Sequence, residues 1–194
     1  YEKLAGSAMH LGRTQEALDL HLKALAVVQR LAEAHPANFE LQRDLGVSQE
    51  KLGTVLLQAG RTKEAIDSFD RSLAVRQRLA DAQPGIAKLQ RDLAIGHEKI
   101  GDIAIALGQT ESALDSYRSS LAIYQQLVDA DPKNPLARRD LSIGFEKLGD
   151  VSLQRGETGD ALRFYRKNLA LAQRAAADDP KNAQAQRDLR VSYS

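Results

Sequence analysis

The chain has 194 residues, of which 43% are hydrophobic and 27% charged, and its net charge at neutral pH is +1. This balance is typical of a soluble globular protein, and no excess of one charge indicates a nucleic-acid or membrane-surface protein. No apolar run approaches the ~20 residues of a membrane span. Cysteine is absent, which excludes disulfides and thiolate metal sites and fits a reducing compartment. We therefore expect a cytoplasmic protein without nucleic-acid or membrane partners.

One stretch of the sequence returns at a constant interval of 48 residues. It reads RDLGVSQEKLG, RDLAIGHEKIG and RDLSIGFEKLG, starting at residues 43, 91 and 139. The chain aligns without gaps as four repeats, 1–48, 49–96, 97–144 and 145–192, and 12 of the 48 columns are identical in all four. A fixed period indicates a repeat array, because each repeat buries its apolar face against its neighbours. We expect a single repeat domain over 1–194, with residues 193–194 starting a further repeat.

Each repeat is expected to contain two helices, called helix A and helix B. In the second hairpin, helix A runs from about 39 to 58 behind Asn38, an N-cap, and its core face shows helical spacing. The core-face residues are Leu41, Leu45, Leu52, Val55 or Leu56, and Ala59. Gly60 ends this helix, and Thr62 is expected to cap helix B, which continues to about 82. The same pattern recurs at Gly12 and Thr14, Gly108 and Thr110, and Gly156 and Thr158.

These residues resemble the tetratricopeptide repeat, whose signature is W-x2-L-G-x2-Y, then A-x3-F, then P. The L-G pair stands at Leu52-Gly53, Ile100-Gly101 and Leu148-Gly149. The A-x3-F pair stands at Ala65 and Phe69, Ala113 and Tyr117, and Ala161 and Tyr165. The repeat is longer than the family's usual unit of about 34 residues, and it is similar to the lengthened repeats of kinesin light chain and to bacterial multidomain tetratricopeptide proteins. The resemblance implies an all-α, right-handed α-solenoid of stacked antiparallel helix pairs.

The resemblance also implies that helix A lines a concave groove that binds a peptide or partner protein. Groove residues are expected at spacings of three and four along helix A, away from the core face. They are Arg43, Val47, Glu50, Thr54 and Leu57, then Arg91, Ile95, Glu98, Asp102 and Ile105, then Arg139, Ile143, Glu146, Asp150 and Leu153. The acidic columns favour a ligand of basic or mixed charge against Glu98, Asp102, Glu146 and Asp150. In a second interpretation, the recurring Arg and Glu only pair with each other within and between neighbouring helices.

The sequence thus predicts a protein-interaction scaffold, as a fragment of a larger protein. The alternative is a structural spacer or self-association module without a peptide ligand. No Ser/His/Asp constellation, phosphate loop or HExxH motif is present, so we expect no enzymatic activity, catalytic residue or cofactor. The four histidines occupy different columns, so no metal site is expected. Both ends cut helix A at the same column without a polar capping repeat, which predicts a longer array and self-association through uncapped ends.

Overall fold

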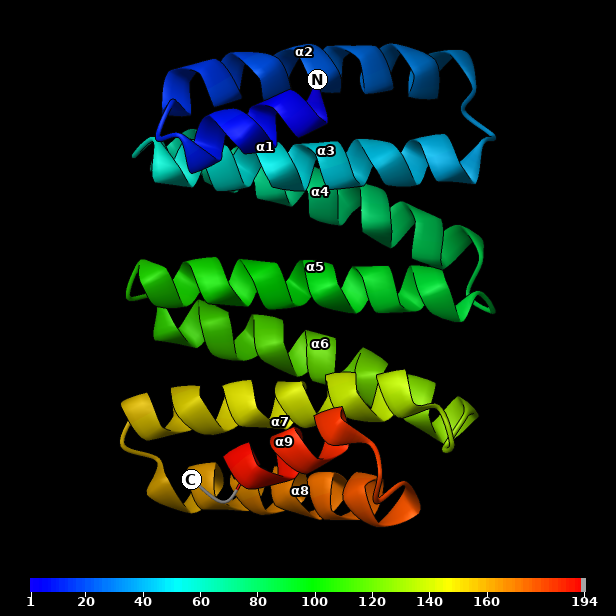
Figure 1. The fold of residues 1–194 in the computed structure, drawn as a ribbon, viewed down its shortest axis with the longest axis vertical. Helices are drawn as coiled ribbons and strands as arrows, with labels where there is room; N and C mark the ends of the chain where they lie inside the picture. The colour runs from blue at the N-terminus through cyan, green and yellow to red at the C-terminus, as the bar shows by residue number, and fades with distance from the viewer. Residues whose placement is uncertain (193–194) are drawn as a thin grey trace. The chain divides into compact units, whose positions relative to one another are not determined.

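The computed structural model describes residues 1–192, apart from the side chains of Glu2 and Met9 (Figure 1). Within these residues all regular structure is helical. The helices are α1 (Glu2–His10), α2 (Thr14–Ala34), α3 (Phe39–Gln58), α4 (Thr62–Ala82), α5 (Ala87–Ala106), α6 (Thr110–Ala130), α7 (Pro135–Gln154), α8 (Thr158–Asp178) and α9 (Ala183–Ser192). The predicted start of a further repeat at 193–194 lies outside the described residues.

The chain divides into two compact units, Tyr1–Leu89 and Gln90–Ser194. In the first unit α1 packs on α2, α2 on α3 and α3 on α4. In the second unit α6 packs on α7, α7 on α8 and α8 on α9. Three residues connect each helix A to its helix B, and four connect each helix B to the next helix A. Within each unit, consecutive helices run antiparallel (Figure 1). The predicted all-helical stacking of antiparallel pairs is confirmed.

The turn from helix A to helix B is a Schellman motif that depends on glycine. In the first unit, the N–H of Gly60 donates to the carbonyl of Leu57 at 3.0 Å, and that of Arg61 to the carbonyl of Leu56 at 2.8 Å. Gly60 has a φ of 73°, a left-handed conformation that glycine adopts without steric cost. The three other predicted stops, Gly12, Gly108 and Gly156, also have positive φ.

Threonine begins each helix B but does not cap it. The four helices start at Thr14, Thr62, Thr110 and Thr158 as expected, yet the N-cap is the residue before each threonine. None of these N-cap side chains makes a capping hydrogen bond. The reason is the Schellman motif: its last residue, Arg61, already serves as the N-cap of α4. The predicted capping role of the threonines is therefore wrong.

At the other turn, the predicted asparagine cap at Asn38 is confirmed. The side-chain oxygen of Asn38 accepts hydrogen bonds from the backbone N–H groups of Glu40 and Leu41, at 3.1 and 3.2 Å. Asn134 caps α7 in the same way, with Pro135 at its first turn. Ala59, predicted in the core, is instead exposed, because it is the C-cap residue that follows the last turn of α3.

The signature residues bring helices A and B together through a glycine that faces an aromatic ring. A methyl group on Gly53 would lie 2.8 Å from the ring of Phe69, and one on Gly101 would lie 2.5 Å from the ring of Tyr117. Both distances are shorter than van der Waals contact, so only glycine fits without displacement of the ring. Ala113, the small residue of the A-x3-F pair, is fully buried. The motif that defines the sequence repeat is therefore the packing contact within each helix pair.

Candidate functional site

Two arginines of the predicted groove pair with aspartates of the next helix A. In the second unit, Arg91 on α5 donates two hydrogen bonds to Asp140 on α7, the one from Nη2 at 3.1 Å. Its hydrogen bond to Asp140 raises the pKa of Arg91 above the usual value. Arg139 on α7 pairs with Asp188 on α9 at 3.4 Å, so the arrangement recurs one repeat later. The arginine column here joins neighbouring helices, with aspartate rather than glutamate as its partner.

The recurring glutamate of helix A, which is Glu50, Glu98 or Glu146, faces a different helix B residue in each repeat. Glu50 forms an ion pair with Arg76 of α4. Glu98 accepts a hydrogen bond from the hydroxyl of Tyr124 of α6, at 3.0 Å. The corresponding residue of α8 is Ala172, which has no polar group. Among the described residues, no hydrogen bond or ion pair reaches Glu146.

The environment of Glu146 disfavours its ionised form. Burial raises the pKa of Glu146, and the neighbouring carboxylate of Asp150 raises it further. Lys147 acts in the opposite direction, whereas Asp188 adds to the increase. The carboxylate therefore lies in a locally acidic, partly desolvated place, where a further cation would stabilise its charged form.

Lys147 of α7 occupies a cation site formed by α5 and α6. Its Nζ lies 2.6 Å from Oδ1 of Asp102, 3.9 Å from Oε1 of Glu98 and 5.5 Å from the centre of the Tyr117 ring. The Tyr117 hydroxyl donates to the same Asp102 oxygen at 2.7 Å. Two carboxylates and an aromatic face are groups that stabilise an ammonium ion. We call Glu98, Asp102 and Tyr117 the interior carboxylate site.

The same three residue types return one repeat later as Glu146, Asp150 and Tyr165, which we call the terminal carboxylate site. The Tyr165 hydroxyl donates to Oδ1 of Asp150 at 2.7 Å, the same bond as in the interior site. Burial, together with this hydrogen bond, raises the pKa of Tyr165 to about 12. Asp150 is exposed to solvent, whereas Asp102 is half-buried. Within residues 1–192, no lysine or arginine forms an ion pair with Glu146 or Asp150.

A hollow of about 230 Å³ lies beside both carboxylate sites in the second unit. It is lined by Asp102, Ile105, Tyr117, Lys147, Asp150, Val151 and Gln154. The structure thus brings together three predicted groove residues, Asp102, Ile105 and Asp150, around one depression. The others of this unit, Ile95, Ile143 and Leu153, lie along α5 and α7, and Leu153 is exposed.

In the first unit, the predicted groove residues lie along α3. Thr54 is exposed, and its hydroxyl donates to the backbone carbonyl of Glu50 at 3.1 Å. Arg43, Val47 and Leu57 are half-buried. Because Thr54 stands where the later repeats have Asp102 and Asp150, this part of the stripe carries less negative charge.

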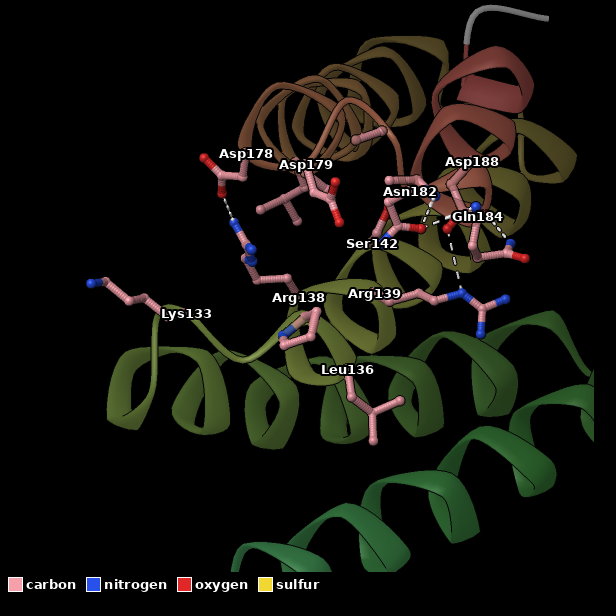
Figure 2. A pocket seen from close by; sticks show the side chains of 15 residues that line it. Lys133, Leu136, Arg138, Arg139, Ser142, Asp178, Asp179, Asn182, Gln184 and Asp188 are labelled. Atoms are coloured by element: carbon pink, nitrogen blue, oxygen red, sulfur yellow. Dashed lines mark hydrogen bonds and ion pairs between the residues drawn. The ribbon is translucent and has the colours of Figure 1, made fainter.

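A larger hollow of about 520 Å³ lies among α7, α8 and α9 (Figure 2). Arg138 pairs with Asp178 at its edge, and Ala172 forms part of its wall. In the preceding repeat the place of Ala172 is taken by Tyr124, which is 1% exposed and belongs to the same core cluster as Leu141. The small residue in α8 thus leaves space that a tyrosine fills in α6. The groove prediction missed this hollow, although the alignment of Tyr124 with Ala172 could have indicated it.

The described part of the chain holds neither a metal-ligand cluster nor a helix that could span a membrane. These residues contain no group of three or more His, Asp or Glu side chains placed to hold a metal ion. None of the helices described there is long and apolar enough to cross a membrane. Burial lowers the pKa of His97, as expected for a packed side chain.

The fold and its recurring contacts define a helical repeat protein. Two models of the tetratricopeptide repeat family match the chain, over residues 1–37 and 44–126, and together they cover more than half of it. The chain belongs to the tetratricopeptide repeat family. Domains of this family are in general protein–protein interaction modules, and the repeat fold is typically non-catalytic. A comparison with curated protein sequences finds no match.

Among solved structures, the chain is similar to the crystal structure of BtubC (BKLC) from P. vanneervenii, with a TM-score of 0.67 and 21% identity. The match covers 92% of this chain and 63% of that chain, so this chain spans less than two thirds of that protein. MamA matches with a TM-score of 0.46 and 15% identity, over 91% of this chain and 99% of that chain. YrrB, described as a tetratricopeptide protein with an unusual peptide-binding site, matches with a TM-score of 0.38 and 20% identity, over 100% and 74%. The similarity to BtubC shows a shared fold.

Proposed function

We propose that the chain is a protein-interaction module whose terminal carboxylate site binds a lysine or arginine side chain of a partner. One observation carries this proposal: the interior carboxylate site, built from the same residue types, binds the ammonium group of Lys147. The terminal site repeats the tyrosine–aspartate hydrogen bond but receives no cation from the described residues. The partner's cation would occupy the place that Lys147 holds one repeat earlier.

The charges already present on the chain determine which part of the predicted groove would bind a basic ligand most tightly. Glu98 and Asp102 already interact with Lys147, so a second cation would find part of their charge neutralised. Among the described residues no cation forms an ion pair with Glu146 or Asp150, although the charge of Lys147 partly offsets the raised pKa of Glu146, and Asp150 is accessible to solvent. A basic or mixed-charge segment is therefore expected at the terminal carboxylate site rather than evenly along all four acids.

Apolar side chains around the site would also contact apolar groups of a partner that lie next to its cation. Ile105 and Val151 line the adjacent hollow, and Leu153 is 53% exposed on the same helix as Asp150. An amphipathic helix that presents a lysine next to aliphatic residues matches this combination. Helix α7 itself, with Lys147 followed by Leu148, is such a segment.

A synthetic peptide with the sequence of residues 135–154 therefore serves as the probe, labelled for fluorescence anisotropy. The matched control is the same peptide with Lys147→Gln. We expect the control to bind about tenfold more weakly, because a hydrogen bond to a charged group contributes about 1.5–3 kcal/mol. Added salt and the protein variant Asp150→Lys should each reduce the difference in affinity between the two peptides. Equal affinity of the two peptides for the wild-type chain would contradict the proposed site.

A second candidate function, self-association without a peptide ligand, is favoured by a different observation. Leu162 of α8 is 47% exposed, although Leu114, its counterpart in α6, is 2% exposed. An uncovered leucine at a core position indicates a surface that another helix can cover.

A further inference from the structure

We propose that a hollow among α2, α3 and α4 of the first unit binds the indole ring of a tryptophan on a partner protein. The indole N–H would donate to the side-chain oxygen of Gln49 on α3, and the ring face would lie against Arg71 of α4. The hollow is formed within the first unit, so neither carboxylate site takes part in it.

The hollow combines an apolar wall with a buried acceptor that lacks a donor. Its volume is about 560 Å³, and Leu45 and Val75 are among the side chains that line it. Gln49 also lines it and is only 6% exposed. Within residues 1–192, the buried Oε1 of Gln49 accepts no hydrogen bond. Because a buried acceptor without a donor is unfavourable, a ligand that brings a donor is stabilised there.

The second unit shows which kind of group the column of Gln49 accommodates. This column holds a ring in both later repeats, as His97 and Phe145. Phe145 is 7% exposed, and its ring centre lies 6.3 Å from that of Phe164 on α8. The residue of α4 that corresponds to Phe164 is Ser68. The first unit thus lacks two rings that the second unit packs together, and its hollow lies at the column of one of them.

The cation that covers the ring in the second unit has a counterpart in the first. The Nζ of Lys167 lies 5.2 Å from the centre of the Phe145 ring, which is a cation–π contact. Arg71 occupies the column of Lys167 and lines the hollow. It is exposed, and no ion pair among residues 1–192 involves it. Gln49 offers no aromatic face, so the guanidinium of Arg71 is available to a ring that a partner brings.

Indole satisfies the acceptor and the cation together. A phenylalanine ring would leave the oxygen of Gln49 without a donor, whereas the indole N–H is a donor and needs no donor in return. Among aromatic side chains, tryptophan also forms the strongest cation–π interactions. Tryptophan is a frequent anchor at the centre of protein interfaces. A partner protein is the expected source, because domains of this family are in general protein–protein interaction modules.

The experiment titrates indole into the whole chain and follows the side-chain amide signals of Gln49 by NMR. 1-Methylindole is the control ligand, because it keeps the ring system but has no N–H donor. We expect saturable shifts with indole and a three- to tenfold weaker affinity, roughly the effect of one neutral hydrogen bond, for 1-methylindole. N-acetyltryptophanamide, which carries the ring on a peptide-like backbone, should shift the same signals.

Three variants separate the two contacts. Gln49→Met keeps a side chain of similar length without the acceptor, so indole and 1-methylindole should bind this variant equally. Arg71→Gln should weaken both ligands by a similar factor of about two to five, because it removes the cation and keeps the acceptor. Gln49→Phe places a ring where the second unit has Phe145, and should abolish binding.

Gln58→Met is the matched control, since Gln58 is an exposed glutamine at the end of the same helix. Its affinities should equal those of the wild type, and circular dichroism checks that each variant remains helical. If Gln49→Phe fails to fold, the two ligands and the Gln49→Met variant still decide. No saturable shift with indole, equal affinity of the wild type for both indoles, or a preference for indole that persists in Gln49→Met would each overturn the site. Binding of indole without binding of N-acetyltryptophanamide would overturn the partner tryptophan.

Discussion

The interior and terminal carboxylate sites contain the same residue types, but only the interior one is closed by a cation. Glu98 accepts a hydrogen bond from Tyr124 and forms an ion pair with Lys147, whereas no described side chain forms a hydrogen bond or ion pair with the carboxylate of Glu146. The difference therefore comes from the neighbours of the site and not from its own residues. One recurring motif can thus be closed by a cation in one repeat and lack a described cation in another. Four sets of substitutions test this distinction, beginning with the set of largest expected effect.

The first compares the leucines beside the two sites. Leu114→Ala should lower the free energy of unfolding by about 2–5 kcal/mol, because it removes a buried side chain from a packed cluster. Leu162→Ala, at the same column but 47% exposed, should change it by about 0.5 kcal/mol or less. Urea denaturation at a concentration where the chain is monomeric measures both. Similar losses for the two variants would remove the distinction between covered and uncovered repeats.

The second compares the glycines that face the tyrosine rings. Gly101→Ala places a methyl group against Tyr117, which is buried and hydrogen-bonded to Asp102, so we expect a loss of about 1–3 kcal/mol. Gly149→Ala makes the same collision with Tyr165, which is less buried and can move more easily. Thermal unfolding should therefore show a smaller loss for Gly149→Ala. The reverse order would mean that the terminal ring is held as firmly as the interior one.

The third removes the cation of the interior site. Lys147→Met leaves Glu98 and Asp102 without their ion pair, and the expected loss is about 1–2 kcal/mol, between the values typical of exposed and of buried pairs. Lys99→Met is the control, because Lys99 is an exposed lysine of the same column. Denaturation in low and high salt should show a larger salt effect in the wild type than in the Lys147 variant. Equal stability of the two variants would argue against a structural role of Lys147.

The smallest expected effect is the pH dependence of folding stability that Glu146 of the terminal carboxylate site causes. Burial and Asp150 raise the pKa of Glu146, so the folded chain holds this proton more tightly than the unfolded chain. Stability from this group is present below its unfolded pKa and decreases as the pH rises through that value toward the folded one. Glu146→Gln should therefore be slightly more stable than the wild type at pH 7, by about 0.5 kcal/mol or less. The advantage should vanish in melting curves below about pH 4; an advantage that grows at low pH would be inconsistent with this assignment.

The helix boundaries could be predicted from the sequence because local residues set them. Gly60 requires a left-handed backbone, and Asn38 binds the N–H groups of its own helix, so both signals act within a few residues. The capping role of Thr62 was wrong because the Schellman turn had already placed the N-cap at Arg61. Local signals thus fixed where the helices run, and the geometry of the turn decided which group caps them.

The contacts of the acidic residues were harder to predict, because they depend on how neighbouring repeats superpose. The sequence suggested that Arg and Glu could pair, but Arg91 reaches Asp140, which lies one repeat and one residue further along. Lysine is present at the column of Lys147 in every repeat, so the sequence could not show which carboxylates it neutralises. The replacement of Tyr124 by Ala172 was visible in the alignment, but its effect on Glu146 requires the packed helices.

The most direct test of the comparison is an NMR titration of the chain with the peptide of residues 135–154, followed at the side chains of both carboxylate sites in one sample. We expect the signals of Tyr165 and Asp150 to shift in proportion to bound peptide, while those of Tyr117 and Asp102 stay in place because Lys147 already occupies their site. Shifts at Tyr117 equal to those at Tyr165, or no shift at Tyr165 at saturating peptide, would contradict the conclusion that the terminal site is the open copy of the interior one.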